Sequence, residues 1–296
     1  MLVYEIKPNG LCGGVKRAIR MISDALENPS TKRPIYMLGN LIHNKLVVDS
    51  LVSKGIILVK DNYLSFLDTV SYGTIVFTAH GISPEIYNKA KTKGLDIIDT
   101  TCVHVLKIQK TVAEKINEGK KVLVIGSENH PEVLGYLGIS KKVSIYKEND
   151  EISDNTFVVN QTTLVYEDLL KTFDKIKEKN NTAEILEEIC DATKRRQAAL
   201  ISELDNYDMF IIVGDKLSNN TRSLLDLVIN HKKKGYQVEK VEDLMGIDFS
   251  LAKSVAVTSG ASTPPLVVKE IIDTIKSIET ITHIESKLTS DDYIKI

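Results

Sequence analysis

The chain has 296 residues, of which 43% are hydrophobic, and its formal net charge at pH 7 is −2. This length allows two or three domains of ordinary size. The near-neutral charge gives no electrostatic footprint for nucleic acid or an anionic membrane surface, and no apolar run approaches the roughly 18 residues needed to span a bilayer. We therefore expect neither nucleic acid nor a membrane among its partners.

Apolar runs alternate with amphipathic segments along the chain. The apolar runs predict strands at 2–6, 35–38, 56–59, 74–78, 96–98, 121–125, 143–146, 156–159, 186–189, 209–213, 237–239 and 254–258. Helical periodicity predicts helices at 14–27, 44–53, 84–93, 103–118, 132–137, 166–179, 193–205, 221–233 and 265–278. Such alternation, with short loops, is typical of mostly parallel sheets covered by helices on both faces, so we expect an α/β fold.

The cysteines mark an internal repeat. Cys12, Cys102 and Cys190 lie 90 and 88 residues apart, and each stands between a strand-like run and a helix-like run. Backbone N–H groups and the helix dipole favour a thiolate at such a turn. Three cysteines cannot all pair as disulfides, and the first residues lack the basic and then apolar pattern of a secretory signal. We therefore expect a reducing, cytoplasmic environment.

The repeat extends beyond the cysteines. In each copy an apolar strand ends in a glycine 27, 24 or 24 residues after the cysteine, and a polar residue follows four positions later: His43, His130 and Ser218. A further strand in each copy is followed by another polar residue: His80, Thr162 and Ser262. The repeat predicts three similar α/β units, at 1–100, 101–188 and 189–296, that deliver thiolates and polar groups to one centre.

Three thiolates at one centre have three physical explanations. A structural zinc site takes four ligands, and Cys₃His is an allowed set, but the usual C-x₂-C pairs are absent. A cubane iron–sulfur cluster normally takes four cysteines, so three would leave one iron open to substrate as a Lewis acid. Each cysteine could also be a small buried hydrophobic residue. The spacing alone leaves these alternatives open.

The motifs around these residues narrow the choice. In chain order they are GLCGGVKRAI (10–19), HNKLVVDSL (43–51), TAHGISP (78–84), DTTC (99–102), NHPEVLGYLG (129–138), QTTL (161–164), CDATKRRQ (190–197), SNNTR (218–222) and TSGASTP (258–264). Together they resemble the 4-hydroxy-3-methylbut-2-enyl diphosphate reductase family, also called LytB, over essentially the whole chain. The resemblance implies three α/β domains in a pseudo-threefold array around a central [4Fe–4S] cluster with three cysteine ligands.

The resemblance also implies an activity. The family reduces an allylic alcohol diphosphate to isopentenyl and dimethylallyl diphosphates, the final step of the non-mevalonate isoprenoid pathway. The substrate hydroxyl is expected to bind the iron that lacks a cysteine, and a one-electron carrier such as ferredoxin or flavodoxin is expected as the electron donor. The alternative is a non-catalytic iron–sulfur or zinc scaffold, or a diphosphate-binding protein.

Residue roles follow from matching the motifs. The cluster ligands match Cys12, Cys102 and Cys190. The diphosphate-binding residues match His43, His80, His130, Ser218, Asn219, Asn220 and Ser262. Glu132 matches the proton donor, and Thr162 matches a relay hydroxyl that also contacts the substrate. A carboxyl held beside a diphosphate and away from water is expected to have a raised pKa. A scaffold has no use for such an acid, so Glu132 together with Thr162 favours the enzyme.

The chain departs from the family pattern at two positions. Asn219 stands where the family commonly has serine, so its substrate contact is less well supported than that of Ser218. Val103 replaces a proline at the first turn of a predicted helix, where proline only pre-sets φ and is replaceable. The remaining histidines match no motif and are interpreted as ordinary surface or packing residues: His104, His231 and His283.

Overall fold

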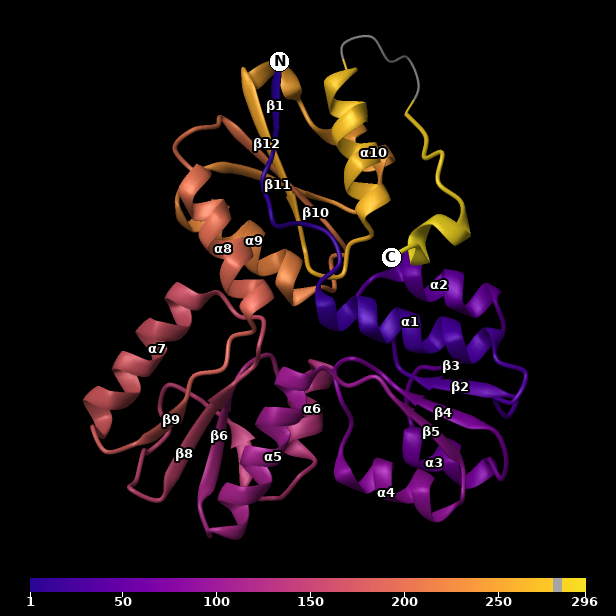
Figure 1. Cartoon of the computed structure of the whole chain (residues 1–296). Helices are drawn as coiled ribbons and strands as arrows, with labels where there is room; N and C mark the ends of the chain where they lie inside the picture. Colours follow the sequence, from indigo (N-terminus) through magenta and orange to yellow (C-terminus); the bar gives the residue numbers. More distant parts are fainter. Residues whose placement is uncertain (279–283) are drawn as a thin grey trace. The chain divides into compact units, whose positions relative to one another are not determined.

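The computed structural model describes residues 1–278 and 284–296 (Figure 1). The described residues form three sheets of four strands each, and neighbouring strands run parallel throughout. This confirms the predicted α/β class with parallel sheets. The chain divides into two compact units, and the larger comprises Arg17–Leu41 and Lys54–Cys190. The other comprises Met1–Lys16, Ile42–Ser53 and Asp191–Ile296.

The larger unit contains two of the sheets. The first sheet has the order β3-β2-β4-β5, with strands β2 (Ile35–Leu38), β3 (Ile56–Val59), β4 (Thr74–Phe77) and β5 (Asp96–Asp99). The second has the order β7-β6-β8-β9, with strands β6 (Lys121–Ile125), β7 (Val143–Ile145), β8 (Thr156–Asn160) and β9 (Glu184–Leu186). The helices of this part of the chain are α1 (Gly13–Glu27), α3 (Tyr63–Thr69), α4 (Pro84–Thr92), α5 (Val103–Asn117), α6 (Pro131–Leu137) and α7 (Tyr166–Lys179).

Side-chain alternation explains how helices cover both faces of the second sheet. Val122 and Val124 of β6 point into a core with α5 and α6, whereas Leu123 between them points into a second core with α7. Successive residues of a strand face opposite sides, so an uninterrupted apolar strand needs helices on both faces. The run KVLVI meets this requirement, because Val122, Leu123 and Val124 are fully buried.

The smaller unit contains the third sheet. Its order is β1-β12-β10-β11, with strands β1 (Leu2–Glu5), β10 (Met209–Val213), β11 (Lys234–Val238) and β12 (Ser254–Ser259). The α-helices are α2 (Lys45–Ser53), α8 (Asp191–Glu203), α9 (Asn219–Asn230) and α10 (Pro265–Lys276), and the short 3₁₀ helices are η1 (Val241–Gly246), η2 (Phe249–Leu251) and η3 (Ser290–Ile294). Helix α9 packs on β10 and β11, and α10 packs on β1 and β12 (Figure 1).

The three sheets share one strand order. From edge to edge they read β5-β4-β2-β3, β9-β8-β6-β7 and β1-β12-β10-β11. The first two sheets each use four consecutive strands, whereas in the third the N-terminal strand β1 takes the edge place that β5 and β9 occupy in the others. One cysteine follows each of these edge strands: Cys102 after β5, Cys190 after β9 and Cys12 after β1. The repeat predicted from the sequence is therefore present at the level of the sheets.

This shared order groups the site residues differently from the predicted units. His43 and His80 follow β2 and β4, so their sheet carries Cys102, whereas the unit predicted at 1–100 groups them with Cys12. Cys12 instead follows β1. Because β1 pairs with β12, Cys12 belongs to the same unit as Asp191–Ile296. The domain boundaries near residues 100 and 188 stay predictions.

Besides η1, η2 and η3, which were not predicted, the clearest differences from the sequence prediction concern three elements. Helix α3 was not predicted; it has only seven residues, about two turns, which is too short for its apolar residues to establish a helical period. Strand β9 ends at Leu186 instead of continuing to 189, because Glu188 exchanges hydrogen bonds with the side chain of Asn160. Strand β11 begins at Lys234 instead of residue 237, directly after the segment predicted as the end of a helix at 221–233. Lysine is common on edge strands, where it discourages pairing with other chains.

Among the described residues, no helix combines the length and the apolar character needed to cross a bilayer.

Candidate active site

The three cysteines occupy equivalent positions. Each directly precedes a helix, α1, α5 or α8, as the predicted strand-to-helix turns require. The backbone N–H of each donates to a carbonyl just after the neighbouring strand: Cys12 to Ala261 at 2.9 Å, Cys102 to Ala79 at 3.0 Å and Cys190 to Thr162 at 3.1 Å. The Sγ of Cys12 also accepts the N–H of Val15, in the first turn of α1, at 3.5 Å.

The DTTC motif forms a supported loop that carries Cys102. The Asp99 carboxylate accepts hydrogen bonds from the N–H of Thr101 at 2.9 Å and from its hydroxyl at 2.5 Å. The Arg17 guanidinium, on α1, donates to the Thr101 carbonyl at 3.1 Å. These contacts hold the backbone on the N-terminal side of Cys102 in place.

Asn160 supports the loop that carries Cys190. Its side-chain amide donates to the Glu188 carbonyl at 3.1 Å and accepts the Glu188 N–H at 3.0 Å. The buried Asn160 side chain thus bonds to both backbone groups of Glu188, as the backbone of a neighbouring strand would. The Glu188 carboxylate in turn lies 3.1 Å from the His104 ring and accepts a hydrogen bond from Lys107 at 2.5 Å. His104 is thus part of a polar network with Glu188 and Lys107 that packs beside the loop. His283 lies outside the described residues.

Glu132 is a buried acid on α6, and its carboxyl oxygens accept hydrogen bonds from the same helix and from the loop just after β8. Its side chain is only 2% exposed. One carboxyl oxygen, Oε1, accepts hydrogen bonds from the Thr162 N–H and from the Tyr136 hydroxyl, both at 2.7 Å. The other, Oε2, accepts the Thr162 hydroxyl at 3.1 Å. His130 is the N-cap residue of α6, where its Nδ1 accepts the Glu132 N–H at 3.3 Å.

Burial raises the pKa of Glu132 above the ordinary carboxyl value, although the hydrogen bonds from Tyr136 and Thr162 act in the opposite direction. A carboxylate loses most of its hydration when buried, and the neutral acid loses less. The predicted increase in the pKa is therefore confirmed, with burial alone as a sufficient cause. A carboxyl group of this kind keeps its proton at a higher pH than an exposed one and can donate it.

His80 and His130 lie side by side, although they follow strands of different sheets, β4 and β6. Their ring centroids are 5.6 Å apart and the rings are nearly perpendicular, at 87°. The next residue, Gly81, has a φ of +78°, and a Cβ there would meet the Gln109 amide at 3.0 Å. Only glycine adopts that backbone conformation without strain, and only glycine leaves room for the Gln109 amide at this distance. Gly81 therefore allows the chain to turn directly after His80.

In the smaller unit, three of the predicted diphosphate-binding residues come together. The Ser262 hydroxyl donates to the His43 carbonyl at 2.9 Å and lies 3.4 Å from the Ser218 hydroxyl. Ser218 is the N-cap residue of α9 and accepts the Thr221 N–H at 3.3 Å. Burial lowers the pKa of His43, and Asp215 opposes this shift only in part. The imidazole is therefore neutral at pH 7, with one N–H to donate.

Asn220 connects α9 to the loop beside Cys12. Its side-chain oxygen accepts the Ala261 N–H at 2.8 Å, and the Ala261 carbonyl accepts the Cys12 N–H. Its amide group donates to Thr193 at 2.8 Å. These hydrogen bonds give Asn220 a structural role in the loop. Asn219, the first residue of α9, is half-buried.

Three further polar residues at the site were not predicted. Tyr136 lies four residues after Glu132, a helical spacing that would have revealed it. Asp215 accepts the Lys45 N–H at 2.8 Å and the Leu217 N–H at 2.7 Å, so it joins the start of α2 to the loop before Ser218. Gln161 accepts the Ser127 N–H at 3.0 Å, which ties down the loop before His130. Asp215 and Gln161 both follow strand ends, as the predicted residues do.

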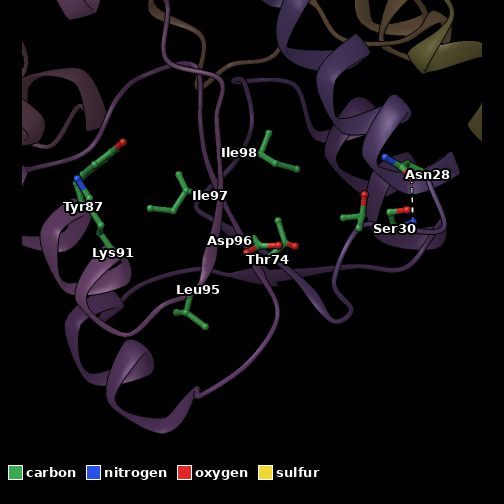
Figure 2. A pocket seen from close by; sticks show the side chains of 10 residues that line it. Asn28, Ser30, Thr74, Tyr87, Lys91, Leu95, Asp96, Ile97 and Ile98 are labelled. Atoms are coloured by element: carbon green, nitrogen blue, oxygen red, sulfur yellow. Dashed lines mark hydrogen bonds between the residues drawn. The ribbon is translucent and has the colours of Figure 1, made fainter.

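The first sheet also borders an open groove away from these residues. Figure 2 shows the groove along the edge strand β5, with Asp96, Ile97 and Ile98 on the strand, Tyr87 and Lys91 on α4, and Asn28 and Ser30 just after α1. None of the predicted site residues is among those that line it.

Parallel strands that end in cysteines, histidines and a buried acid define an α/β protein with its chemistry at the carboxyl ends of the sheets, an arrangement typical of enzymes of this class. The comparisons give the family. The family model described as "LytB protein" matches residues 3–276, so the chain belongs to the LytB family.

Curated relatives and solved structures agree with this assignment. The chain is 38% identical over 290 residues to a 4-hydroxy-3-methylbut-2-enyl diphosphate reductase of Anoxybacillus flavithermus, covering 94% of this chain and 91% of the relative. Identity to the same enzyme of Geobacillus kaustophilus is 37% over 290 residues, with the same coverage. The structure of the Plasmodium falciparum E-1-hydroxy-2-methyl-but-2-enyl-4-diphosphate reductase matches with a TM-score of 0.87 and 28% identity, covering 99% of this chain and 96% of that one. A structure described as the terminal enzyme of the non-mevalonate pathway matches with a TM-score of 0.65 and 29% identity, covering 94% and 100%.

Proposed function

We propose that this chain reduces 4-hydroxy-3-methylbut-2-enyl diphosphate to isopentenyl and dimethylallyl diphosphates, the last step of the non-mevalonate isoprenoid pathway. The reaction consumes two electrons and two protons, breaks the C–O bond of the allylic alcohol and releases water. Membership of the LytB family supports the activity. The observation that carries the proposal is the buried Glu132 carboxyl, hydrogen-bonded twice by Thr162, because a scaffold or a binding protein has no use for it.

Family membership implies an iron–sulfur cofactor, and we assign it as a [4Fe–4S] cluster held by Cys12, Cys102 and Cys190. The donor set fits this group, since each sheet offers one half-buried cysteine at the start of a helix, and cysteine sulfur is the usual ligand of such clusters. When bound, such a cluster supplies electrons and a Lewis-acidic iron that lacks a cysteine ligand.

The diphosphate is assigned to the polar side chains at the strand ends. These are His43, His80, His130, Ser218, Asn219, Asn220 and Ser262. The neutral imidazole of His43 and the hydroxyls at the start of α9 are donors suited to an anion, and the N-terminus of this 12-residue helix adds its dipole. Charge-assisted hydrogen bonds of this kind bind a diphosphate without a dense lysine cluster.

Glu132 is assigned as the proton donor and Thr162 as the hydroxyl that passes the proton on. Hydroxide is a poor leaving group, so a proton must reach the oxygen as the C–O bond breaks. The raised pKa of Glu132, caused by burial, keeps this carboxyl protonated at a higher pH than an exposed one. We further assign a one-electron carrier, ferredoxin or flavodoxin, as the electron donor and the cytoplasm as the location.

An anaerobic assay of the iron-loaded protein tests the activity. With 4-hydroxy-3-methylbut-2-enyl diphosphate and an artificial reductant, both five-carbon diphosphate products are expected. Binding of the substrate without turnover in iron-loaded protein would support the diphosphate-binding alternative. A colourless protein that carries zinc would support the scaffold.

A further inference from the structure

Tyr136 is a buried titratable group with no role in the mechanism above. It lies one helical turn after Glu132 on α6, its side chain is fully buried, and its hydroxyl donates to Glu132 Oε1 at 2.7 Å. Buried tyrosine hydroxyls need a hydrogen-bond partner, and here that partner is the proposed acid.

The hydrogen bonds distinguish the two oxygens of the Glu132 carboxyl. Oε1 accepts two N–H or O–H groups, from Tyr136 and from the backbone of Thr162, whereas within residues 1–278 and 284–296 Oε2 accepts only the Thr162 hydroxyl, at the longer distance of 3.1 Å. A proton on Oε1 would displace one of two good donors. A proton on Oε2 needs only a rotation of the Thr162 hydroxyl, which then accepts the hydrogen bond instead of donating it.

We propose that Tyr136 is a positioning residue: together with the Thr162 N–H it occupies Oε1 and so confines the acidic proton of Glu132 to Oε2, which faces the Thr162 hydroxyl. This inference rests on the proposed function. In the resulting transfer, Oε2 gives its proton to Thr162 Oγ, and Thr162 gives its own hydroxyl proton to the departing oxygen, which leaves as water. Glu132 is left as a carboxylate, and the hydrogen bonds to Oε1 stabilise that charge.

The hydroxyl of Tyr136 is suited to this role because it stays protonated. Burial, together with the neighbouring Glu132, raises the pKa of Tyr136 well above its ordinary value. The other titratable groups near the pair are His130 at the start of α6, His104 on α5, and Cys102 and Glu188 on the adjoining loops. His104 favours the ionised form of Glu132, so Tyr136 and His104 act in the same direction.

Tyr136 also packs in an apolar core with Val105, Ile108 and Val133. If packing were its only role, phenylalanine would serve equally well, since it fills nearly the same volume. Tyr136→Phe removes only the hydroxyl and therefore separates the two roles. Tyr146→Phe is a matched control, because the buried hydroxyl of Tyr146 has no hydrogen-bond partner among the described residues.

The experiment measures the protonation of Glu132 in the iron-loaded protein by infrared difference titration, with Glu132→Gln to identify its carboxyl band. Tyr136→Phe removes a donor to the ionised form, so the pKa of Glu132 is expected to rise by about one to two pH units. The alkaline limb of the kcat profile is expected to move up by the same amount, and its plateau to fall by about twofold, because the proton is then shared between the two oxygens. Tyr146→Phe should change neither.

Replacing Tyr136 with 3,5-difluorotyrosine tests for a shift of the Glu132 pKa in the opposite direction. The fluorinated ring is of similar size but its hydroxyl is a stronger hydrogen-bond donor, so the pKa of Glu132 should fall. If Tyr136→Phe folds and binds iron but leaves the pKa of Glu132 and the pH profile unchanged, Tyr136 only packs. The same conclusion follows if the fluorinated protein does not lower that pKa. Absence of turnover in iron-loaded wild-type protein contradicts the proposed function instead, and the infrared titration still tests the position of the proton.

Discussion

Thr162 holds the Glu132 carboxyl at both of its oxygens, with the backbone N–H 2.7 Å from Oε1 and the hydroxyl 3.1 Å from Oε2. The two residues follow different strands, β6 and β8, which are neighbours in the second sheet. The carbonyl of Thr162 also accepts the N–H of Cys190 at 3.1 Å. One residue therefore joins the proposed acid to the backbone of a proposed cluster ligand, which makes the second sheet the centre of the proposed proton transfer.

The buried carboxyl makes stability depend on pH. Burial raises the folded-state pKa of Glu132 above its unfolded value, so its contribution to stability is fully present below the unfolded pKa and is lost as the pH rises through the folded pKa. Glu132→Gln has no such loss. The free energy of unfolding of the variant relative to wild type is therefore expected to increase with pH, by about 1.4 kcal/mol for each pH unit between the two pKa values, and its relative melting temperature rises with it. Anaerobic thermal melts between pH 4 and 9 measure it, with the exposed Glu128→Gln as control. A difference that does not change with pH would contradict the raised pKa.

The cluster assignment predicts that all three cysteines are needed. Changing Cys12, Cys102 or Cys190 to serine should remove most of the iron and nearly all activity, because each sheet offers one cysteine at its edge strand and the chain has no other. Iron analysis and visible absorbance under anaerobic conditions measure the loss, and circular dichroism checks the fold. Full iron and turnover in any one of these variants would show that the three-ligand assignment is wrong.

The paired hydroxyls of Ser218 and Ser262 provide a test of diphosphate binding. Each hydrogen bond to the anion contributes about 1.5–3 kcal/mol, so either alanine variant should weaken affinity for inorganic diphosphate by about ten- to a hundredfold. Titration calorimetry measures this without turnover. Ser202→Ala is the control, since Ser202 is exposed on α8 and its hydroxyl bonds only within that helix. Affinities equal to the control in both variants would remove these residues from the binding site.

Much of the site could be predicted from the sequence because its residues follow strand ends. Buried strands such as β6 are continuous apolar runs, and His130 and Thr162 stand a few residues beyond them. The pairing of β1 with β12 could not be predicted in this way, because about 250 residues separate the two strands and hydrophobic pattern carries no information on distant partners. The predicted units consequently grouped Cys12 with His43 and His80.

Side-chain partners were also beyond the sequence pattern. Asp215 and Lys45 are 170 residues apart, and only the folded chain shows that the carboxylate of one accepts the N–H of the other. From the sequence alone, Tyr136 is indistinguishable from an ordinary apolar position of α6. In the structure its ring packs in the core, and its hydroxyl donates a hydrogen bond to Glu132. Polar contacts made by largely apolar side chains leave no periodic signal.

The close packing around Gly260 predicts that a larger residue at this position, two residues before Ser262, would clash with its surroundings. A Cβ at this position would lie 2.1 Å from the Thr221 hydroxyl oxygen, in the first turns of α9. Gly260→Ala is therefore expected to destabilise the protein by about 1–3 kcal/mol, the usual cost of overpacking. Gly246→Ala is the matched control, because nothing lies within 4 Å of its Cβ position. Urea unfolding compares the two, and equal midpoints would show that the loop beside Ser262 accommodates a methyl group freely.

The most direct test of the proposed reductase is the anaerobic turnover of Glu132→Gln beside wild type. Glutamine keeps the shape and the hydrogen-bond acceptor of the acid but cannot donate an acidic proton. With iron content and substrate affinity verified as unchanged, kcat for 4-hydroxy-3-methylbut-2-enyl diphosphate is expected to fall at least about a hundredfold, as for the loss of a general acid. Near-normal turnover in this variant would contradict the role of Glu132 and make the substrate's own diphosphate the source of the proton.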